Sequence, residues 1–390
     1  MVTPDGLLHI FIIAGEPSGD ALGGRLMAAL NSTASPEIRY SGVGGPRMEA
    51  QGLESLFDYR QLAVMGLVEV LPQVPRLLRR IRDVATAIET LRPDAIITID
   101  APSFAFAVLR RLKSHDQPRI HYVAPQVWAW RPKRVNKLRK YVDHILALFP
   151  FEPAYFDAAG MPCTFVSHPV LEDVATPEAG RAFRARHNIA EDALVLCALP
   201  GSRRNEVRKL KPVIMDTITR LAARHAGLHV VIPTVSTVLE DVRTIASRDV
   251  PITILEDAAE KSAAMAASNV AVSASGTATL ELACARVPTV VIYKVALITG
   301  WLGRYLVNVK YASIVNIMAS REVLPEFLQE YCKPKKIVAA LNDMIENKDR
   351  RQEIIDAEIA VVQQLANGGQ SPSERAAEAA LRVIAEFQPR

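Results

Sequence analysis

Residues 195–207 read VLCALPGSRRNEV, an apolar run that leads directly into a tight polar turn and then into a helical pattern. The same order recurs along the chain, where β-branched runs such as AIITI at 95–99 and TVVIY at 289–293 alternate with longer helical patterns. This alternation is typical of parallel strands linked by helices, and uninterrupted apolar runs suit strands covered on both faces. The sequence therefore predicts an α/β fold built on doubly wound parallel sheets.

The length of 390 residues exceeds one ordinary hydrophobic core and favours two domains. We expect an N-terminal Rossmann-like domain over 1–172, a second one over 186–365 after a polar linker that contains two prolines, and a helix within 366–390 that returns to the first domain. Strands are predicted at 8–14, 38–43, 95–99, 119–123, 144–148, 164–166, 194–199, 228–232, 252–255, 270–273 and 289–293.

Composition narrows the class of protein. A net charge of +4 is weaker than nucleic-acid binders usually carry, so no nucleic-acid partner is expected, but it suits an anionic substrate or an anionic membrane face. The four cysteines are scattered without the spacing of a zinc site, and we expect a reducing compartment, the cytoplasm, with no metal and no cofactor. Neither a signal peptide nor a membrane-spanning stretch is predicted.

Two segments of the second half have the chemistry of an anion site. Gly201, Ser202 and Arg203 follow a predicted strand, where free backbone N–H groups and a forked cation can neutralise a diphosphate. A similar turn follows the strand at 270–273, formed by Ser275, Gly276 and Thr277, and Glu281 lies one helical turn beyond it, where a carboxylate can accept both hydroxyls of a ribose. An ordinary βα turn with an exposed arginine, and a solvated helix glutamate, are the alternatives.

No Walker A loop occurs in the chain, and neither segment matches the glycine pattern of a dinucleotide fold. A kinase, an ATPase and a dehydrogenase are therefore disfavoured. Two anion-binding turns in one domain instead predict a nucleotide-diphosphate ligand.

The first half supplies candidate acids and bases. Glu16, Ser18 and Asp20 follow the first strand within GEPSGD, where they could hold sugar hydroxyls or simply form a turn before a helix. Asp100 ends the strand at 95–99, at the edge where open parallel sheets bind ligands, and it is the candidate general base. A helix N-cap is the alternative for Asp100, and His121 and His168 are lower-ranked rival bases.

The stretch 61–83 is apolar first and basic afterwards, which indicates either a packed helix or a lobe that meets anionic lipid. Trp128 and Trp130, within VWAWRPKR, repeat the combination of aromatic and basic residues that is common at membrane interfaces. The predicted lipid-facing residues are Val64, Met65, Leu67, Val68, Val70, Leu71, Arg76 and Arg79.

Two doubly wound domains in series that face a cleft form the glycosyltransferase-B plan, which some sugar-nucleotide epimerases and phosphorylases share. The sequence closely resembles the lipid-A-disaccharide synthase family over nearly the whole chain, because it contains eight motifs of that family in the family's order. The motifs are AGEPSGD at 14–20, GVGGPRM at 42–48, MGLVEVL at 65–71, IDAPSF at 99–104, VWAWRPKR at 127–134, LPGSRRNEV at 199–207, SGTATLELA at 275–283 and NIMASREVLPEFLQ at 316–329.

The resemblance implies an inverting, metal-independent glycosyltransferase at the inner face of the cytoplasmic membrane. Such an enzyme joins UDP-2,3-diacylglucosamine to 2,3-diacylglucosamine 1-phosphate through a β(1→6) link and releases UDP. By motif position, Arg203 and Glu281 are implied in the UDP site, Asp100 as the base, Glu16 as a catalytic neighbour, and Asn316 and Glu322 as substrate contacts.

This chain departs from the family pattern at a few positions. Ser103 stands where an acidic residue is usual, so Asp100 is the one carboxylate of that motif, and Gln126, Ser167 and His168 also differ. A UDP-sugar 2-epimerase of similar fold is the alternative enzyme, and a non-catalytic nucleotide-sugar sensor is a third class. Acyl-chain length and oligomeric state, including a homodimer with exchanged C-terminal helices, are left open.

Overall fold

The computed structural model describes residues 6–33, 37–62, 74–114, 116–126, 135–245, 249–294, 310–366 and 368–388. The chain divides into two compact units, residues 1–169 with 367–390 (unit 1) and residues 170–366 (unit 2). Each unit contains one sheet in which every described strand pairing is parallel.

Unit 1 has a seven-stranded sheet in the order β3-β2-β1-β4-β5-β6-β7. Its strands are β1 Leu8–Ala14, β2 Ile38–Val43, β3 Leu53–Ser55, β4 Ala95–Ile99, β5 Arg119–Tyr122, β6 His144–Ala147 and β7 Cys163–Phe165. Its helices are α1 Pro17–Thr33, α2 Pro46–Glu49, α4 Val74–Leu91, α5 Pro102–Leu109, α7 Val135–Leu138, α8 Glu152–Asp157 and α18 Pro372–Glu386, with the 3-10 turn η1 Tyr59–Leu62. The 3-10 turn η4 Pro169–Glu172 spans the boundary in the chain between the two units.

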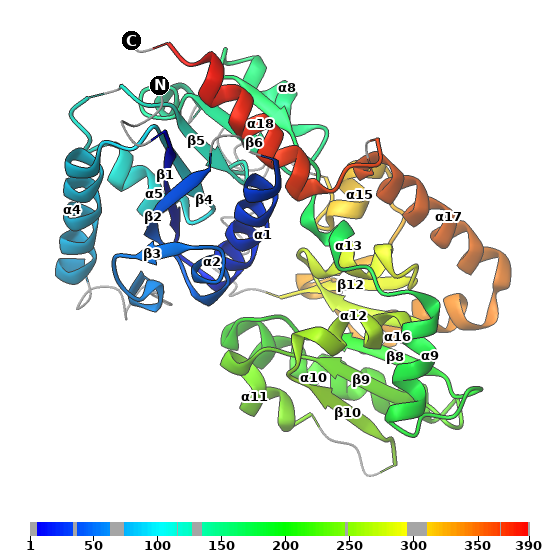
Figure 1. Ribbon diagram of the computed structural model, residues 1–390. Coiled ribbons are helices and arrows are strands. Elements are labelled where there is room, and N and C mark those ends of the chain that lie inside the picture. The colour runs from blue at the N-terminus through cyan, green and yellow to red at the C-terminus, as the bar shows by residue number, and fades with distance from the viewer. Residues whose placement is uncertain are drawn as a thin grey trace. The chain divides into compact units, whose positions relative to one another are not determined.

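The alternation of side chains along β1 builds two cores in unit 1. Ile10 and Ile12 face the layer that holds α1 and α18, whereas Phe11 and Ile13 face the layer that holds α4 and α5. Figure 1 shows α4 and α1 on opposite sides of this sheet, with α18 beside α1. Burial on both faces is why β1 is apolar at almost every position.

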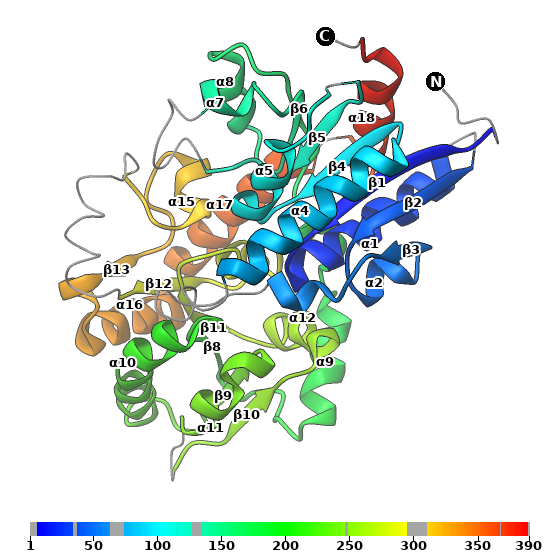
Figure 2. The ribbon, with the colours of Figure 1, turned by 90° about the vertical axis from the view of Figure 1, so that its left-hand side faces the viewer.

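Unit 2 repeats the plan with six strands in the order β10-β9-β8-β11-β12-β13. The strands are β8 Val195–Leu199, β9 His229–Pro233, β10 Ile252–Leu255, β11 Val270–Ala274, β12 Thr289–Tyr293 and β13 Glu326–Leu328. The helices are α9 Pro177–Arg186, α10 Arg204–Ala222, α11 Leu239–Arg243, α12 Ala258–Ala266, α13 Ala278–Cys284, α15 Ile314–Ala319, α16 Pro334–Glu346 and α17 Lys348–Leu365, with 3-10 turns η5 Ser236–Val238 and η6 Gln329–Tyr331. Figure 2 shows the same elements from the side.

Two details differ from the sequence prediction. The polar segment read as a linker contains α9, which begins at Thr176–Pro177 and buries Phe183 against the core of unit 2. A threonine N-cap followed by proline is a helix-start signal, so the proline marks a helix there rather than a linker. The short edge strands β3 and β13 were not predicted, because three residues without a β-branched run give no periodic signal.

Candidate functional site

The order of strands reverses between β1 and β4 in unit 1, and the loops that follow these two strands leave from the same edge. Ala14 pairs with Ile99, so Gly15 and Asp100 begin neighbouring loops. A Cβ added to Gly15 would lie 3.2 Å from the Cβ of Ala101, which shows how closely the two loops approach. Open parallel sheets bind ligands at such a reversal, so the geometry brings the two N-terminal motifs to one candidate site.

Asp100 sits in an unusual turn at this edge. Asp100 and Ala101 have φ angles of 47° and 42°, the left-handed region that non-glycine residues seldom adopt. The N-cap of α5 is Ala101, so the N-cap alternative for Asp100 does not hold. Burial raises the pKa of the Asp100 carboxyl, and a hydrogen bond from the backbone N–H of Ala101 partly offsets that rise. A half-buried carboxylate of raised pKa has the character of a general base.

Asp20, predicted as a substrate contact, binds backbone groups of a neighbouring loop. Its side chain is only 4% exposed. Its Oδ1 accepts from the backbone N–H groups of Gly45 (2.8 Å) and Met48 (3.1 Å), and its Oδ2 accepts from the backbone N–H of Arg47 (3.2 Å). These bonds tie the first motif to the loop GVGGPRM, so Asp20 positions that loop instead of facing a sugar.

Glu16 and Ser18 are exposed at the start of α1, beside Asp100 along the sheet edge. The rival bases are inside the protein. Burial lowers the pKa of His121 to about 3 and that of His168 to about 4. His121 is fully buried and its Nδ1 is 2.7 Å from Thr98 Oγ1, so it belongs to the core rather than to a site that meets substrate.

Unit 2 has the corresponding reversal between β8 and β11, where Leu199 pairs with Ser273. The turn after β8 requires glycine at position 201, because its φ is 107° and a Cβ there would lie 2.7 Å from Glu206 Oε2. Arg203 is the N-cap residue of the 19-residue helix α10. Its guanidinium is 74% exposed and forms an ion pair with Glu206 at 2.9 Å.

Backbone donors converge on this turn. Within the described parts of the chain, the N–H groups of Ser202, Arg204 and Asn205 donate no hydrogen bond. The first turn of a long helix, a glycine turn and an exposed guanidinium together have the chemistry that an anion site requires.

The loop after β11 is anchored at one end and open at the other. Ser275 Oγ donates to the Ala312 carbonyl (2.8 Å), so its hydroxyl holds a neighbouring loop rather than a ligand. Gly276 and Thr277 are exposed, and a Cβ on Gly276 would meet no atom within 4 Å. Their N–H groups have no acceptor among the described residues. Space and free donors at this position are compatible with a bound phosphate.

Glu281 lies on α13 behind this loop and is paired with a residue that the sequence did not indicate. Lys261 Nζ on α12 is 2.6 Å from Glu281 Oε2. Both side chains are about one-third exposed, at 38% and 31%. The two residues come from different helices, so no local sequence pattern relates them.

Asn316, predicted as a substrate contact, is fully buried. Its amide nitrogen donates to the Leu324 carbonyl (2.8 Å) and to Glu326 Oε1 (2.7 Å), and its oxygen accepts from the N–H groups of Val323 and Leu324 (2.8 and 2.9 Å). Glu326 in turn accepts from the N–H groups of Ala312 (2.7 Å) and Ser313 (2.8 Å). The pair therefore supports the loop that holds Ser275, while Glu322 nearby is exposed.

The predicted lipid-facing residues 64–71 lie outside the described residues, as do Trp128 and Trp130. Arg76 and Arg79 are exposed on α4, and Leu78 between them is 44% exposed. Arg80, on the same helix, instead donates a hydrogen bond to the side chain of Gln61, and its guanidinium lies 4.5 Å from the centre of the Phe57 ring. No helix among the described residues is long and apolar enough to cross a membrane.

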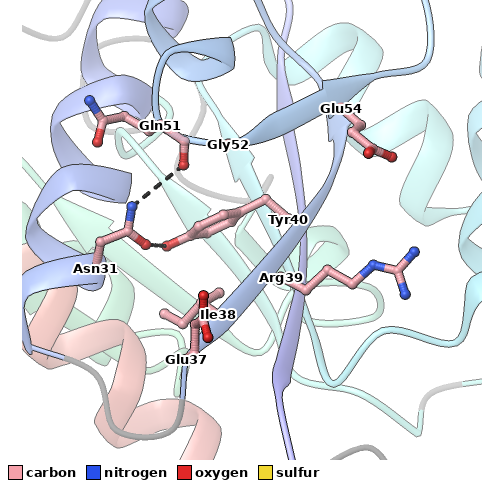
Figure 3. A pocket seen from close by; sticks show the side chains of 8 residues that line it. All are labelled: Asn31, Glu37, Ile38, Arg39, Tyr40, Gln51, Gly52 and Glu54. Atoms are coloured by element: carbon pink, nitrogen blue, oxygen red, sulfur yellow. Dashed lines mark hydrogen bonds between the residues drawn. The ribbon is translucent and has the colours of Figure 1, made fainter. Parts of the chain in front are cut away.

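Cavities in the two units lie away from these loops. One of about 400 Å³ in unit 1 is lined by Asn31, Glu37, Ile38, Arg39, Tyr40, Gln51, Gly52 and Glu54 (Figure 3). It lies where β2 begins, the sheet edge opposite Asp100, and within it the Tyr40 hydroxyl donates to Asn31 Oδ1 (2.9 Å). Another of about 550 Å³ lies at the amino ends of β9 and β10 in unit 2. Neither cavity contains a predicted site residue.

Solved structures of low sequence identity share this architecture. A UDP-GlcNAc 2-epimerase from Neisseria meningitidis bound to UDP-GlcNAc is 12% identical with a TM-score of 0.62, over 98% of this chain and 100% of that chain. Acinetobacter baumannii MurG is 13% identical with a TM-score of 0.54, over 97% and 100%. At these identities the likeness shows the fold alone, and it confirms the predicted glycosyltransferase-B class.

Relatives found by sequence have a much higher identity to this chain than those solved structures. Proteins named lipid-A-disaccharide synthase are 51% identical in Rhodospirillum centenum, over 97% of this chain and 95% of the relative, and 40% identical in Pseudomonas aeruginosa, over 97% and 99%. The family model described as lipid-A-disaccharide synthetase matches residues 10–382. With the motif loops gathered at the strand-order reversal of each unit, the chain belongs to the lipid-A-disaccharide synthetase family.

Proposed function

We propose that the chain transfers a 2,3-diacylglucosaminyl group from UDP to 2,3-diacylglucosamine 1-phosphate, forming a β(1→6) disaccharide 1-phosphate and releasing UDP. Family membership supports lipid A disaccharide synthesis. The identity of the two substrates is the more specific part of this proposal. The observation that carries the donor assignment is the adjacency of the loops 201–203 and 275–277 at the reversal of unit 2. Ligands of open parallel sheets bind at that edge.

The proposed chemistry needs a group that stabilises the leaving diphosphate. The Arg203 guanidinium and the N–H groups of Ser202 and Arg204 supply positive charge and donors where that charge develops. Gly201, Gly276 and Thr277 allow the phosphates to approach the backbone, and Glu281 accepts the ribose hydroxyls.

The acceptor needs a base. As the acceptor oxygen attacks the anomeric carbon, Asp100 takes the hydroxyl proton and the bond to UDP breaks on the opposite face, which inverts the configuration. Glu16, Ser18 and Glu322 are the exposed candidates for contacts to the sugars. Asp20, Ser275 and Asn316 act indirectly, by holding the loops.

Acylated substrates reside in membranes, and we assign the membrane contact to the region of α4. Arg76 and Arg79 present cations beside the exposed Leu78, and in the sequence they follow the apolar stretch 64–71. Cations flanking an apolar lobe bind anionic lipid. This supports a peripheral location on the inner face of the inner membrane.

The epimerase alternative is not favoured. Epimerases match at 12–14% identity, a level that reflects shared fold, whereas the synthases match at 39–51%. The test incubates purified protein with the UDP-sugar alone and with both acylated sugars, and follows the sugar by NMR. We expect the UDP-sugar to remain unchanged when it is incubated alone, and a β-linked disaccharide to form when the acceptor is also present. Epimerisation of the UDP-sugar without acceptor would overturn the proposal.

A further inference from the structure

The contact between Lys261 and Glu281 is asymmetric. Lys261 Nζ lies 2.6 Å from Oε2 of the carboxylate. That oxygen is buried, although the Glu281 side chain as a whole is 31% exposed. The oxygen that remains available to solvent or a ligand is therefore Oε1.

Both charges of the pair also act on Cys197 of β8. Burial raises the pKa of that thiol to about 12, with the Lys261 charge lowering it and the Glu281 charge raising it. β8 is one of the two strands at the reversal of unit 2. Lys261 thus connects helix α12 to the carboxylate behind the loop 275–277, and it limits the directions in which that carboxylate can turn.

A held carboxylate suits the recognition of a vicinal diol. An ionised carboxylate accepts hydrogen bonds at both oxygens, and one oxygen can accept from two adjacent hydroxyls. If the side chain were free to rotate, ordering it would cost part of the binding free energy. A lysine that occupies the inward oxygen keeps the carboxylate oriented before the ligand arrives.

We propose that Lys261 is a positioning residue that fixes Glu281 so that its Oε1 accepts the ribose hydroxyls, and that the pair selects ribonucleotides over 2′-deoxyribonucleotides. This inference rests on the proposed UDP site. A site built to bond a hydroxyl discriminates against an analogue that lacks it, because its own polar group is then left without a partner.

The test compares the affinity of UDP with that of 2′-deoxy-UDP by titration calorimetry. The wild type should prefer UDP by about tenfold to a hundredfold, the effect of one unpaired charged acceptor. Lys261→Met should bring that ratio close to one, mainly by weakening UDP, and Glu281→Gln should do the same. Lys261→Arg should retain most of the preference, because it keeps the charge opposite Oε2.

Lys335→Met is the matched control, since Lys335 is exposed on α16. Melting curves of each variant separate loss of fold from loss of selectivity. A merely structural Lys261 would weaken both nucleotides equally and leave the ratio unchanged, which would overturn the inference. A wild type that binds UDP without preference over 2′-deoxy-UDP would also overturn it, whereas a wild type that binds neither nucleotide would refute the donor site itself.

Discussion

The side-chain amide of Asn316 donates to Oε1 of Glu326 at 2.7 Å, and Glu326 in turn binds the backbone of the loop that Ser275 contacts. This link explains how a fully buried residue can belong to a site motif. It acts by holding the loop in place.

Asn316→Ala is expected to lower the stability of unit 2 even without substrate. The change leaves the buried N–H groups of Val323 and Leu324 and the Leu324 carbonyl without their partner, and removes one of the bonds to Glu326, which should cost about 3 kcal/mol. For a unit of this size the melting temperature should fall by about 6–12 °C, measured by calorimetry. Glu322→Ala, an exposed neighbour, should change it little. An Asn316→Ala protein that melts like the wild type but has lost UDP affinity would instead indicate direct ligand contact.

Asp100→Asn is expected to remove turnover while sparing UDP binding, because it keeps the size of the side chain but removes the basic oxygen. The loss in kcat should be about a hundredfold to ten-thousandfold. In the wild type the acid limb of kcat/KM should lie above the ordinary carboxyl range, because burial raises the pKa of Asp100 and the base must be deprotonated to act. Ser103→Ala is the control, expected to retain activity. Asp100→Asn with full turnover would exclude Asp100 as the base.

Arg203→Ala is expected to weaken UDP binding itself, by about a hundredfold or ~3 kcal/mol. Arg220→Ala is the matched control and should leave UDP affinity unchanged, because Arg220 pairs with Asp216 (2.8 Å) near the opposite end of α10. Calorimetric titration with UDP measures both. Equal affinities for UDP in wild type and Arg203→Ala would refute the role of the turn at 201–203.

The triple change Arg76→Gln, Arg79→Gln and Arg82→Gln is expected to reduce binding to vesicles that contain anionic lipid. Each exposed arginine should contribute about 1 kcal/mol, and the effect should shrink at high salt. Co-sedimentation with phosphatidylglycerol vesicles measures it, with phosphatidylcholine vesicles for comparison. Removing the charges of Lys333, Lys335 and Lys348, which are exposed in unit 2, is the matched control. Equal losses in the two triple variants would argue against α4 as the membrane contact.

Glu358 should make stability depend on pH. It is fully buried in α17, neither of its oxygens has a partner among the described residues, and burial raises its pKa well above 4.5. A carboxyl whose pKa is raised on folding stabilises the folded state below the unfolded pKa, and this stabilisation is lost as the pH rises through the folded value.

Above pH 4.5 the free energy of unfolding of the wild type should fall by up to about 1.4 kcal/mol per pH unit because of this group. Glu358→Gln should make this decline shallower, because the amide does not ionise. Chemical denaturation at a series of pH values measures the slopes. Parallel slopes for the two proteins would mean that Glu358 is not a buried neutral acid.

Much of the fold was predictable because the central strands are buried on both faces. Runs such as 8–14, 95–99 and 289–293 match β1, β4 and β12 at both ends. The edge strands β3 and β13 escaped prediction because they are short and half-buried, and α9 because its proline was read as a linker signal.

For the site, the rule that ligands bind at the carboxyl ends of parallel strands singled out the loops after β1, β4, β8 and β11, and the strand order that makes these loops neighbours came from the structure. The sequence could not reveal which side chains turn inward. Asp20 and Asn316 bind backbone groups, and the partners of Glu281 and Asn316, Lys261 and Glu326, come from other elements. These contacts depend on tertiary packing, which has no periodic signal in the chain.

The most direct measurement is the stoichiometry of a reaction with purified protein, UDP-2,3-diacylglucosamine and 2,3-diacylglucosamine 1-phosphate. The proposal predicts one UDP released for each tetraacyl disaccharide 1-phosphate formed, with neither product when the acceptor is withheld. Release of UDP without acceptor, or no disaccharide with both sugars present, would contradict it.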